Sequence, residues 1–138
     1  MKFNRINLAA LLTLTALLAQ AAYAGAGYSD PVKHEINGKD LKARMDKNES
    51  VVILDARSHL NGQMIKGAVH VPASKLEEWA KTADKNAIIV TYCTCPHDEA
   101  AEEEMHQLRD LGFASAFSLK GGLEAARAAG LEIIPVSE

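Results

Sequence analysis

Covalent cross-links contribute little to this protein, because its 138 residues include only two cysteines, Cys93 and Cys95. Two cysteines separated by a single residue cannot form the disulfide framework that holds many small exported proteins together. The fold must therefore depend on a hydrophobic core. The two cysteines are candidates for a functional role rather than a structural one.

The sequence also lacks a strong charge of either sign. It contains 15 lysines and arginines against 18 aspartates and glutamates, which gives a formal net charge of −3 at pH 7. A mildly acidic surface argues against nucleic acids and anionic membranes as partners, since both attract positively charged proteins. Internal repeats and low-complexity runs are absent from residue 25 onward. We therefore expect one ordinary domain, and we expect it to be a monomer.

Long apolar runs are confined to the first 24 residues. Lys2 and Arg5 precede an almost wholly apolar stretch over 8–18, and Ala22-Tyr23-Ala24 matches a small-x-small cleavage site. Residues 1–24 are therefore predicted to be a cleaved signal peptide, and the mature protein is expected to be periplasmic or secreted. The apolar stretch is shorter than the roughly 20 residues that span a bilayer, so we expect no stable membrane insertion after cleavage.

Cleavage would leave one domain-sized chain. The 138 residues less the first 24 are 114 residues, and the formal net charge would change from −3 to −5 because Lys2 and Arg5 leave and no acid does. This length is common for one domain and sufficient for a hydrophobic core. Residues 25–33 are predicted to be a polar lead-in, and residues 34–138 the domain.

Strand-like and helix-like segments alternate along the domain. Apolar runs predict four strands, over residues 51–54, 68–71, 87–92 and 114–119. Helices are predicted after an Asn37 N-cap, from a Ser74–Glu77 capping box, along the face of Ala101, Met105, Leu108 and Leu111, and over 122–129. This alternation is typical of an α/β domain with a mainly parallel sheet. Residues 55–67 are expected to form a loop with at most one helical turn, and Glu102 to Glu104 a solvated surface.

Cys93 directly follows the apolar strand predicted over 87–92 and precedes an alanine-rich helix start. A cysteine at this place faces backbone N–H groups that the helix does not use, and these favour the thiolate, which is the nucleophilic form. The carboxyl ends of parallel strands share one edge of a sheet. Asp55 and the segment Lys120-Gly121-Gly122 should therefore open onto the same rim as Cys93.

Several short segments along the chain carry a resemblance to a known family. They are, in order, Asp55-Ala56-Arg57, Ile65 to Pro72, Val90 to Cys93, Leu119 to Gly122, and Ala129-Gly130. In this order and spacing the sequence resembles the single-domain rhodaneses, from about residue 34 to 134. The resemblance implies a five-stranded, mainly parallel sheet with helices on both faces. It also implies a loop around the cysteine whose N–H groups form an anion-binding cradle.

The resemblance further implies a sulfurtransferase. Cys93 would take a sulfane sulfur from a small donor such as thiosulfate, hold it as a persulfide, and pass it to a protein thiol or another thiophilic acceptor. No metal or organic cofactor is implied, because the enzyme itself carries the sulfur. The substrate-binding loop would consist of Thr94, Cys95, Pro96, His97, Asp98 and Glu99.

This loop departs from the usual rhodanese pattern of cysteine, two residues, glycine, one residue, arginine and a small hydroxyl residue. Asp98 occupies the arginine position, and Pro96 removes one N–H donor from the cradle. If Asp98 and Glu99 point into the cradle, they should cancel its attraction for a dianion. If they cap the following helix as its N-cap and first residue, the cradle stays usable, and we favour this second arrangement.

Other functions remain open for the same residues. Cys95 lies close enough in sequence to form a disulfide with Cys93, which would suit a thiol-redox protein in an oxidising compartment. Cys93, Cys95 and His97 could bind copper(I) or zinc weakly, but no fourth ligand lies nearby, so no metal is expected. A binding module that kept the fold and lost the chemistry is the third alternative.

Supporting residues are expected to have mainly structural roles. Asp55 and Arg57 should tie the rim loops together by a salt bridge and hydrogen bonds rather than take part in transfer. His70 is expected to be a hydrogen-bonded core or edge histidine rather than a base. Gly121 and Gly122 should form a turn with positive φ that lets the backbone approach a substrate.

Overall fold

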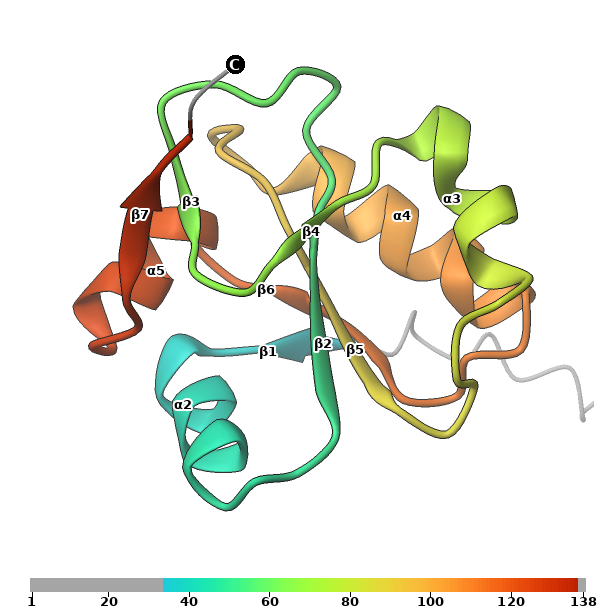
Figure 1. Cartoon of the computed structure of the whole chain (residues 1–138), viewed down its shortest axis with the longest axis horizontal. Coiled ribbons are helices and arrows are strands. Elements are labelled where there is room, and N and C mark those ends of the chain that lie inside the picture. Colours follow the sequence, from blue (N-terminus) through green and yellow to red (C-terminus); the bar gives the residue numbers. More distant parts are fainter. Residues whose placement is uncertain (1–33, 137–138) are drawn as a thin grey trace, which may run out of the picture. The chain divides into compact units, whose positions relative to one another are not determined.

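The structure of this protein is a computed structural model that describes residues 34–136 (Figure 1). The predicted signal peptide and the lead-in over 25–33 lie outside the described residues. Within residues 34–136, no helix is long and apolar enough to cross a membrane.

Five parallel strands form the central sheet in the spatial order β1-β6-β5-β2-β4. Their bounds are β1 (Glu35–Ile36), β6 (Ala116–Leu119), β5 (Ile88–Tyr92), β2 (Val51–Asp55) and β4 (Val69–His70). The apolar runs in β2 and β5 are continuous because both faces of a parallel sheet are covered. The predicted α/β fold with a five-stranded parallel sheet is confirmed, and β5 lies at its centre.

Two pairs of helices cover the two faces of the sheet (Figure 1). On one face lie α2 (Gly38–Asp46) and α5 (Gly122–Ala128), and on the other lie α3 (Ala73–Ala80) and α4 (Glu99–Asp110). Each pair closes its own core: Leu41 belongs to the first, and Leu76 and Leu108 belong to the second, all fully buried. The prediction of helices on both faces is therefore confirmed.

The helix starts show one correct and one wrong prediction. Asn37 caps α2 as predicted, because its side-chain oxygen accepts a hydrogen bond from the Asp40 N–H at 2.9 Å. The capping box predicted from Ser74 and Glu77 does not form, since α3 already begins at Ala73. Pro72, with φ fixed at −66°, starts that helix earlier and leaves Ser74 inside the first turn.

A second, two-stranded sheet lies outside the main one. It pairs β3 (Gln63–Ile65) with β7 (Ile133–Pro135) in antiparallel register. The prediction that residues 55–67 form only a loop is therefore wrong for β3. The paired segments lie in opposite halves of the chain, so a local sequence pattern does not reveal their pairing.

Candidate active site

Cys93 lies immediately beyond the carboxyl end of β5, with 1% of its surface exposed. The following segment, 94–98, leads into α4 and is bordered by two cavities. One of about 330 Å³ is lined by Cys93, Thr94, Cys95, Pro96, Asp98, Gly121, Leu123 and Glu124. The other, of about 340 Å³, is lined by Arg57, Ser58, His59, Asn61, Cys93, Thr94, Cys95 and Ala100. The structure thus brings most of the predicted site residues together around the cysteine.

Two loop residues of the predicted site line neither cavity. His97 and Glu99 are exposed, and the His97 Nδ1 atom lies 3.3 Å from a carboxylate oxygen of Glu99. Exposed pairs of this kind contribute little to stability. Both side chains therefore belong to the outer surface of the loop.

The two cysteines are joined by a disulfide bond. Their Cα atoms are 5.6 Å apart, within the usual range for a disulfide. Cys93 is buried, whereas Cys95 is half-buried and borders both cavities. The N–H of Cys95 points at the Cys93 sulfur, at 3.4 Å. In this state neither sulfur is a nucleophile, and reduction of the bond would release one thiol on each side of Thr94.

Asp98 occupies the predicted N-cap position of α4, but its side chain does not cap that helix. Its backbone is left-handed, with φ 57°, and its carboxylate accepts a hydrogen bond from the Gly121 N–H at 2.7 Å. The favoured expectation of a helix-capping Asp98 is therefore wrong for the side chain, because the Gly121 N–H across the loop supplies its partner. Glu99 is the first residue of α4, as expected.

The Asp98 carboxylate adds negative charge beside the cysteines. Asp98 and Glu124 both line the smaller cavity. The Asp98 carboxylate also accepts the N–H of Gly121, another residue that lines this cavity, so that N–H is not available to a ligand. Two like charges about 4 Å apart cost roughly 1 kcal/mol in water and roughly 4 kcal/mol near a protein surface. This cavity therefore suits neutral ligands or thiols better than a dianion.

The Gly121-Gly122 turn brings α5 against the cysteine loop. Both residues have positive φ, 79° and 50°, as the sequence predicts. A Cβ atom on Gly122 would lie only 2.2 Å from the carbonyl oxygen of Cys93. The same carbonyl accepts a hydrogen bond from the Leu123 N–H at 3.4 Å. Only glycine fits at residue 122 without moving the backbone that carries Cys93.

Asp55 and Arg57 form a buried ion pair behind the loop. The Arg57 Nε–H donates to Asp55 at 2.8 Å, and the guanidinium also donates to the carbonyl oxygens of Asn61 and Gln63 at 2.8 and 3.0 Å. The hydrogen bond with Asp55 raises the pKa of Arg57 above its usual value, although burial opposes this. Most of the guanidinium N–H groups are thus occupied, and they tie Asp55 at the end of β2 to Asn61 and to Gln63, the first residue of β3. The half-buried His70 bonds to the carbonyl oxygen of Arg57 through Nε2 at 2.7 Å.

Tyr92 completes this network, although no motif in the sequence predicted a role for it. Its hydroxyl donates to Asp55 at 2.7 Å and accepts from the Ile65 N–H at 3.2 Å. Burial, followed by the hydrogen bond to Asp55, raises the pKa of Tyr92 far above its usual value, so the hydroxyl stays neutral. A tyrosine that ends an aliphatic strand is itself a signal, because a buried hydroxyl needs a partner.

Glu104 is a buried acid, so the prediction that it belongs to a solvated surface is wrong. It is 1% exposed, and within residues 34–136 neither of its carboxylate oxygens has a hydrogen-bond partner. Burial, and to a smaller extent the charge of Asp55, raises the pKa of Glu104 to about 8. The helical phase explains the error, since Glu104 follows Ala101 by three residues on the buried face of α4.

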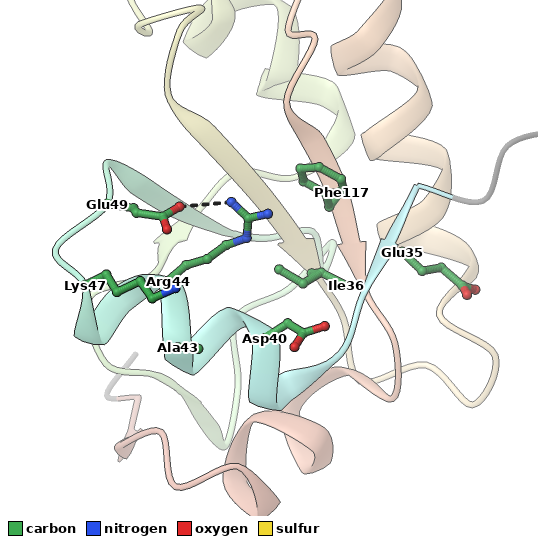
Figure 2. Close-up of a pocket in the computed structure, with 8 residues that line it drawn as sticks. All are labelled: Glu35, Ile36, Asp40, Ala43, Arg44, Lys47, Glu49 and Phe117. Carbon is green, nitrogen blue, oxygen red and sulfur yellow. Dashed lines mark hydrogen bonds and ion pairs between the residues drawn. The ribbon is translucent and has the colours of Figure 1, made fainter.

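A further hollow, of about 350 Å³, lies away from the cysteines between α2 and the strands β1 and β6 (Figure 2). Its charged lining includes Asp40, Lys47 and an ion pair in which Arg44 donates to Glu49 at 2.9 Å. None of its eight lining residues is a cysteine, serine, threonine or histidine. The chemistry suggested by the sequence therefore belongs to the cysteine loop.

Comparison with known proteins decides the family. The family model for the rhodanese-like domain matches residues 37–129. These residues include the whole cysteine loop and every strand of the main sheet except β1. The chain belongs to the rhodanese-like domain family. This rhodanese-like domain is similar to the thiosulfate sulfurtransferase GlpE of Coxiella burnetii (strain RSA 331), with 31% identity over 84 residues, 59% of this chain and 77% of that protein.

Solved structures support the same family. The rhodanese-like domain of an Anabaena sp. protein has 28% identity and a TM-score of 0.65, over 76% of this chain and 81% of that one. A Bacillus halodurans protein has 26% identity and a TM-score of 0.65, over 85% and 86%. The thiosulfate sulfurtransferase of Pseudomonas aeruginosa has 25% identity and a TM-score of 0.61, over 71% of this chain and 19% of that one.

Proposed function

We propose that this protein is an exported sulfurtransferase that carries sulfane sulfur on Cys93. The observation that carries the proposal is the position of Cys93, at the end of the central strand and between two cavities. Similarity to proteins named thiosulfate sulfurtransferases supports it. The partners would be a small sulfur donor and a thiol acceptor, in the periplasm or outside the cell.

The reaction starts from the reduced protein. The Cys93 thiolate attacks the sulfane sulfur of the donor, the donor's S–S bond breaks, and sulfite leaves with the electron pair when the donor is thiosulfate. The persulfide then gives its outer sulfur to an acceptor thiolate, and the Cys93 thiolate is regenerated. The N–H of Cys95, which points at the Cys93 sulfur, stabilises negative charge there. The buried Asp55–Arg57 pair holds the loop before β3 that borders the larger cavity.

A second candidate function is thiol–disulfide exchange. The observation that favours it is the Cys93–Cys95 disulfide. A substrate thiolate would attack the half-buried Cys95 sulfur, and Cys93 would leave as a thiolate. The two functions differ in the need for Cys95, because sulfur loading on Cys93 does not require it.

Serine variants of the two cysteines test the proposal. The reduced protein, freed of reductant, is mixed with thiosulfate or an organic persulfide, and sulfur loading is followed by sulfite release and by intact mass in a single turnover. Loading falls to the uncatalysed background in Cys93→Ser, because the attacking sulfur is gone. Cys95→Ser still loads one sulfur and becomes about 32 Da heavier. Equal loss in both variants would reject the proposal and favour the two-cysteine redox function.

A further inference from the structure

The disulfide shows that the Cys95 sulfur can bond to the Cys93 sulfur, which is the bond that Cys95 would form if it attacked a Cys93 persulfide. In the structure the two sulfur atoms are bonded to each other within the loop that joins β5 to α4. A Cys95 thiolate can therefore reach the Cys93 Sγ atom from within the same loop. An attacking group already held beside its target has a high effective concentration, so it competes well with an acceptor from solution.

The charges at the site weigh against an external anionic acceptor. The Asp98 and Glu124 carboxylates line the cavity where such an acceptor would approach the cysteines. Cys93 is also only 1% exposed. Cys95 is half-buried and borders both cavities, so it is the sulfur that a molecule from solution reaches more easily.

From this geometry we infer that Cys95 resolves the Cys93 persulfide, so that the sulfane sulfur leaves as hydrogen sulfide and the protein is left with the Cys93–Cys95 disulfide. The inference rests on the proposed loading of Cys93. When Cys95 attacks before an external acceptor does, the protein acts as a sulfane-sulfur reductase, which consumes a thiol reductant, and the sulfur is not passed to the acceptor.

The electrons balance over two steps. The Cys95 thiolate forms a bond to the Cys93 Sγ atom, the bond from that atom to the sulfane sulfur breaks, and the sulfane sulfur leaves as hydrosulfide with the electron pair and the persulfide proton. The sulfane sulfur is thereby reduced, and the two cysteines are oxidised. A small or protein thiol then attacks the Cys95 sulfur and forms a mixed disulfide, which a second thiol cleaves. The reduced pair returns, and the thiols leave as their disulfide.

A single turnover without external thiol tests this inference. The reduced wild-type protein, Cys95→Ser and Cys95→Ala are each mixed with thiosulfate or an organic persulfide, with Cys93→Ser as background, and sulfite, sulfide and intact mass are measured. Wild-type protein should release one sulfide for each sulfur loaded and become about 2 Da lighter than its reduced form. Both Cys95 variants should release no sulfide and stay about 32 Da heavier.

The outcomes separate this inference from the proposed function. If wild-type protein keeps the added 32 Da (about the mass of one sulfur) and releases no sulfide, the resolving role of Cys95 is overturned and loading on Cys93 stands. If neither donor loads the wild-type protein or either Cys95 variant, the proposed function fails and the inference fails with it. Agreement between the serine and alanine variants shows that the lost sulfide reflects the missing thiol rather than the serine hydroxyl.

Discussion

Asp98 is the residue in which this loop differs most in charge from the usual rhodanese pattern. Its carboxylate lines the cavity beside Cys93 and Cys95 and accepts the Gly121 N–H. The side chain therefore has two separable effects. It orders the loop against the start of α5, and it places a negative charge where a thiolate must form.

Asp98→Asn separates these effects, because the amide oxygen can still accept from Gly121 while the charge is lost. In a Cys95→Ser background, we expect Cys93 to be alkylated about two- to five-fold faster at pH 7, since a nearby like charge disfavours the thiolate. Asp98→Arg should increase the rate further and favour thiosulfate over a neutral donor. The control is Glu99→Gln, whose side chain lines neither cavity. Identical alkylation curves for all variants would show that Asp98 does not influence the sulfur.

At Gly122 the backbone at the start of α5 packs directly against the backbone of Cys93. We expect Gly122→Ala to lower the free energy of unfolding by at least about 2 kcal/mol more than Gly62→Ala. Both glycines have positive φ, so both substitutions strain the backbone, but nothing lies within 4 Å of a Cβ at Gly62, whereas the Cys93 carbonyl lies 2.2 Å from one at Gly122. Urea unfolding of both variants measures the difference. Equal losses of unfolding free energy in the two variants would mean that the Cys93 backbone moves away from the added Cβ at little energetic cost.

At the scale of the element, α4 begins next to the two cysteines and carries a buried acid, Glu104, on the face that packs into the core. It begins directly after the cysteine loop and buries Ala101, Glu104, Met105 and Leu108. The acid on that face has no hydrogen-bond partner within residues 34–136 and its pKa is raised to about 8. Since an ordinary glutamate ionises near pH 4, the folded protein binds a proton here that the unfolded chain has already lost.

The sign of the resulting pH dependence follows from this difference. Between about pH 5 and 8 the folded state holds more protons than the unfolded state, so the contribution of Glu104 to stability falls as the pH rises and reaches its minimum above its folded pKa. Glu104→Gln should remove this dependence and make the protein more stable than wild type at pH 9, by about 2–4 kcal/mol. Urea unfolding of the oxidised proteins from pH 6 to 9 checks this, with the exposed Glu103→Gln as control. A wild-type slope that persists in Glu104→Gln would contradict the assignment.

At the scale of the whole molecule, long and regular patterns predicted most of the fold. The continuous apolar runs over 51–54 and 87–90 became most of the parallel strands Val51–Asp55 and Ile88–Tyr92, because both faces of a parallel sheet are covered. The two-residue strand Glu35–Ile36 was not predicted from its own sequence, and neither was the β3–β7 pairing. Such short segments gain their structure from distant partners, which local periodicity cannot reveal.

The candidate site was predictable in position but not in orientation. Strand ends placed Cys93, Asp55 and Gly121 on one rim, because the carboxyl ends of parallel strands meet at one edge. The direction of the Asp98 side chain depends on the Gly121 N–H, which belongs to another segment. Likewise, the acidic composition around Glu104 suggested a solvated surface, and only the phase of the packed helix showed that this residue is buried.

The central claim, that Cys93 carries the sulfane sulfur, is tested most directly by locating that sulfur. Reduced wild-type protein is mixed with thiosulfate or an organic persulfide, quenched with an alkylating agent after increasing times, and fragmented by mass spectrometry. The extra sulfur should appear first on Cys93, and it should disappear as the Cys93–Cys95 disulfide forms. Extra sulfur that appears first on Cys95, or on neither cysteine while a donor is consumed, would contradict the claim.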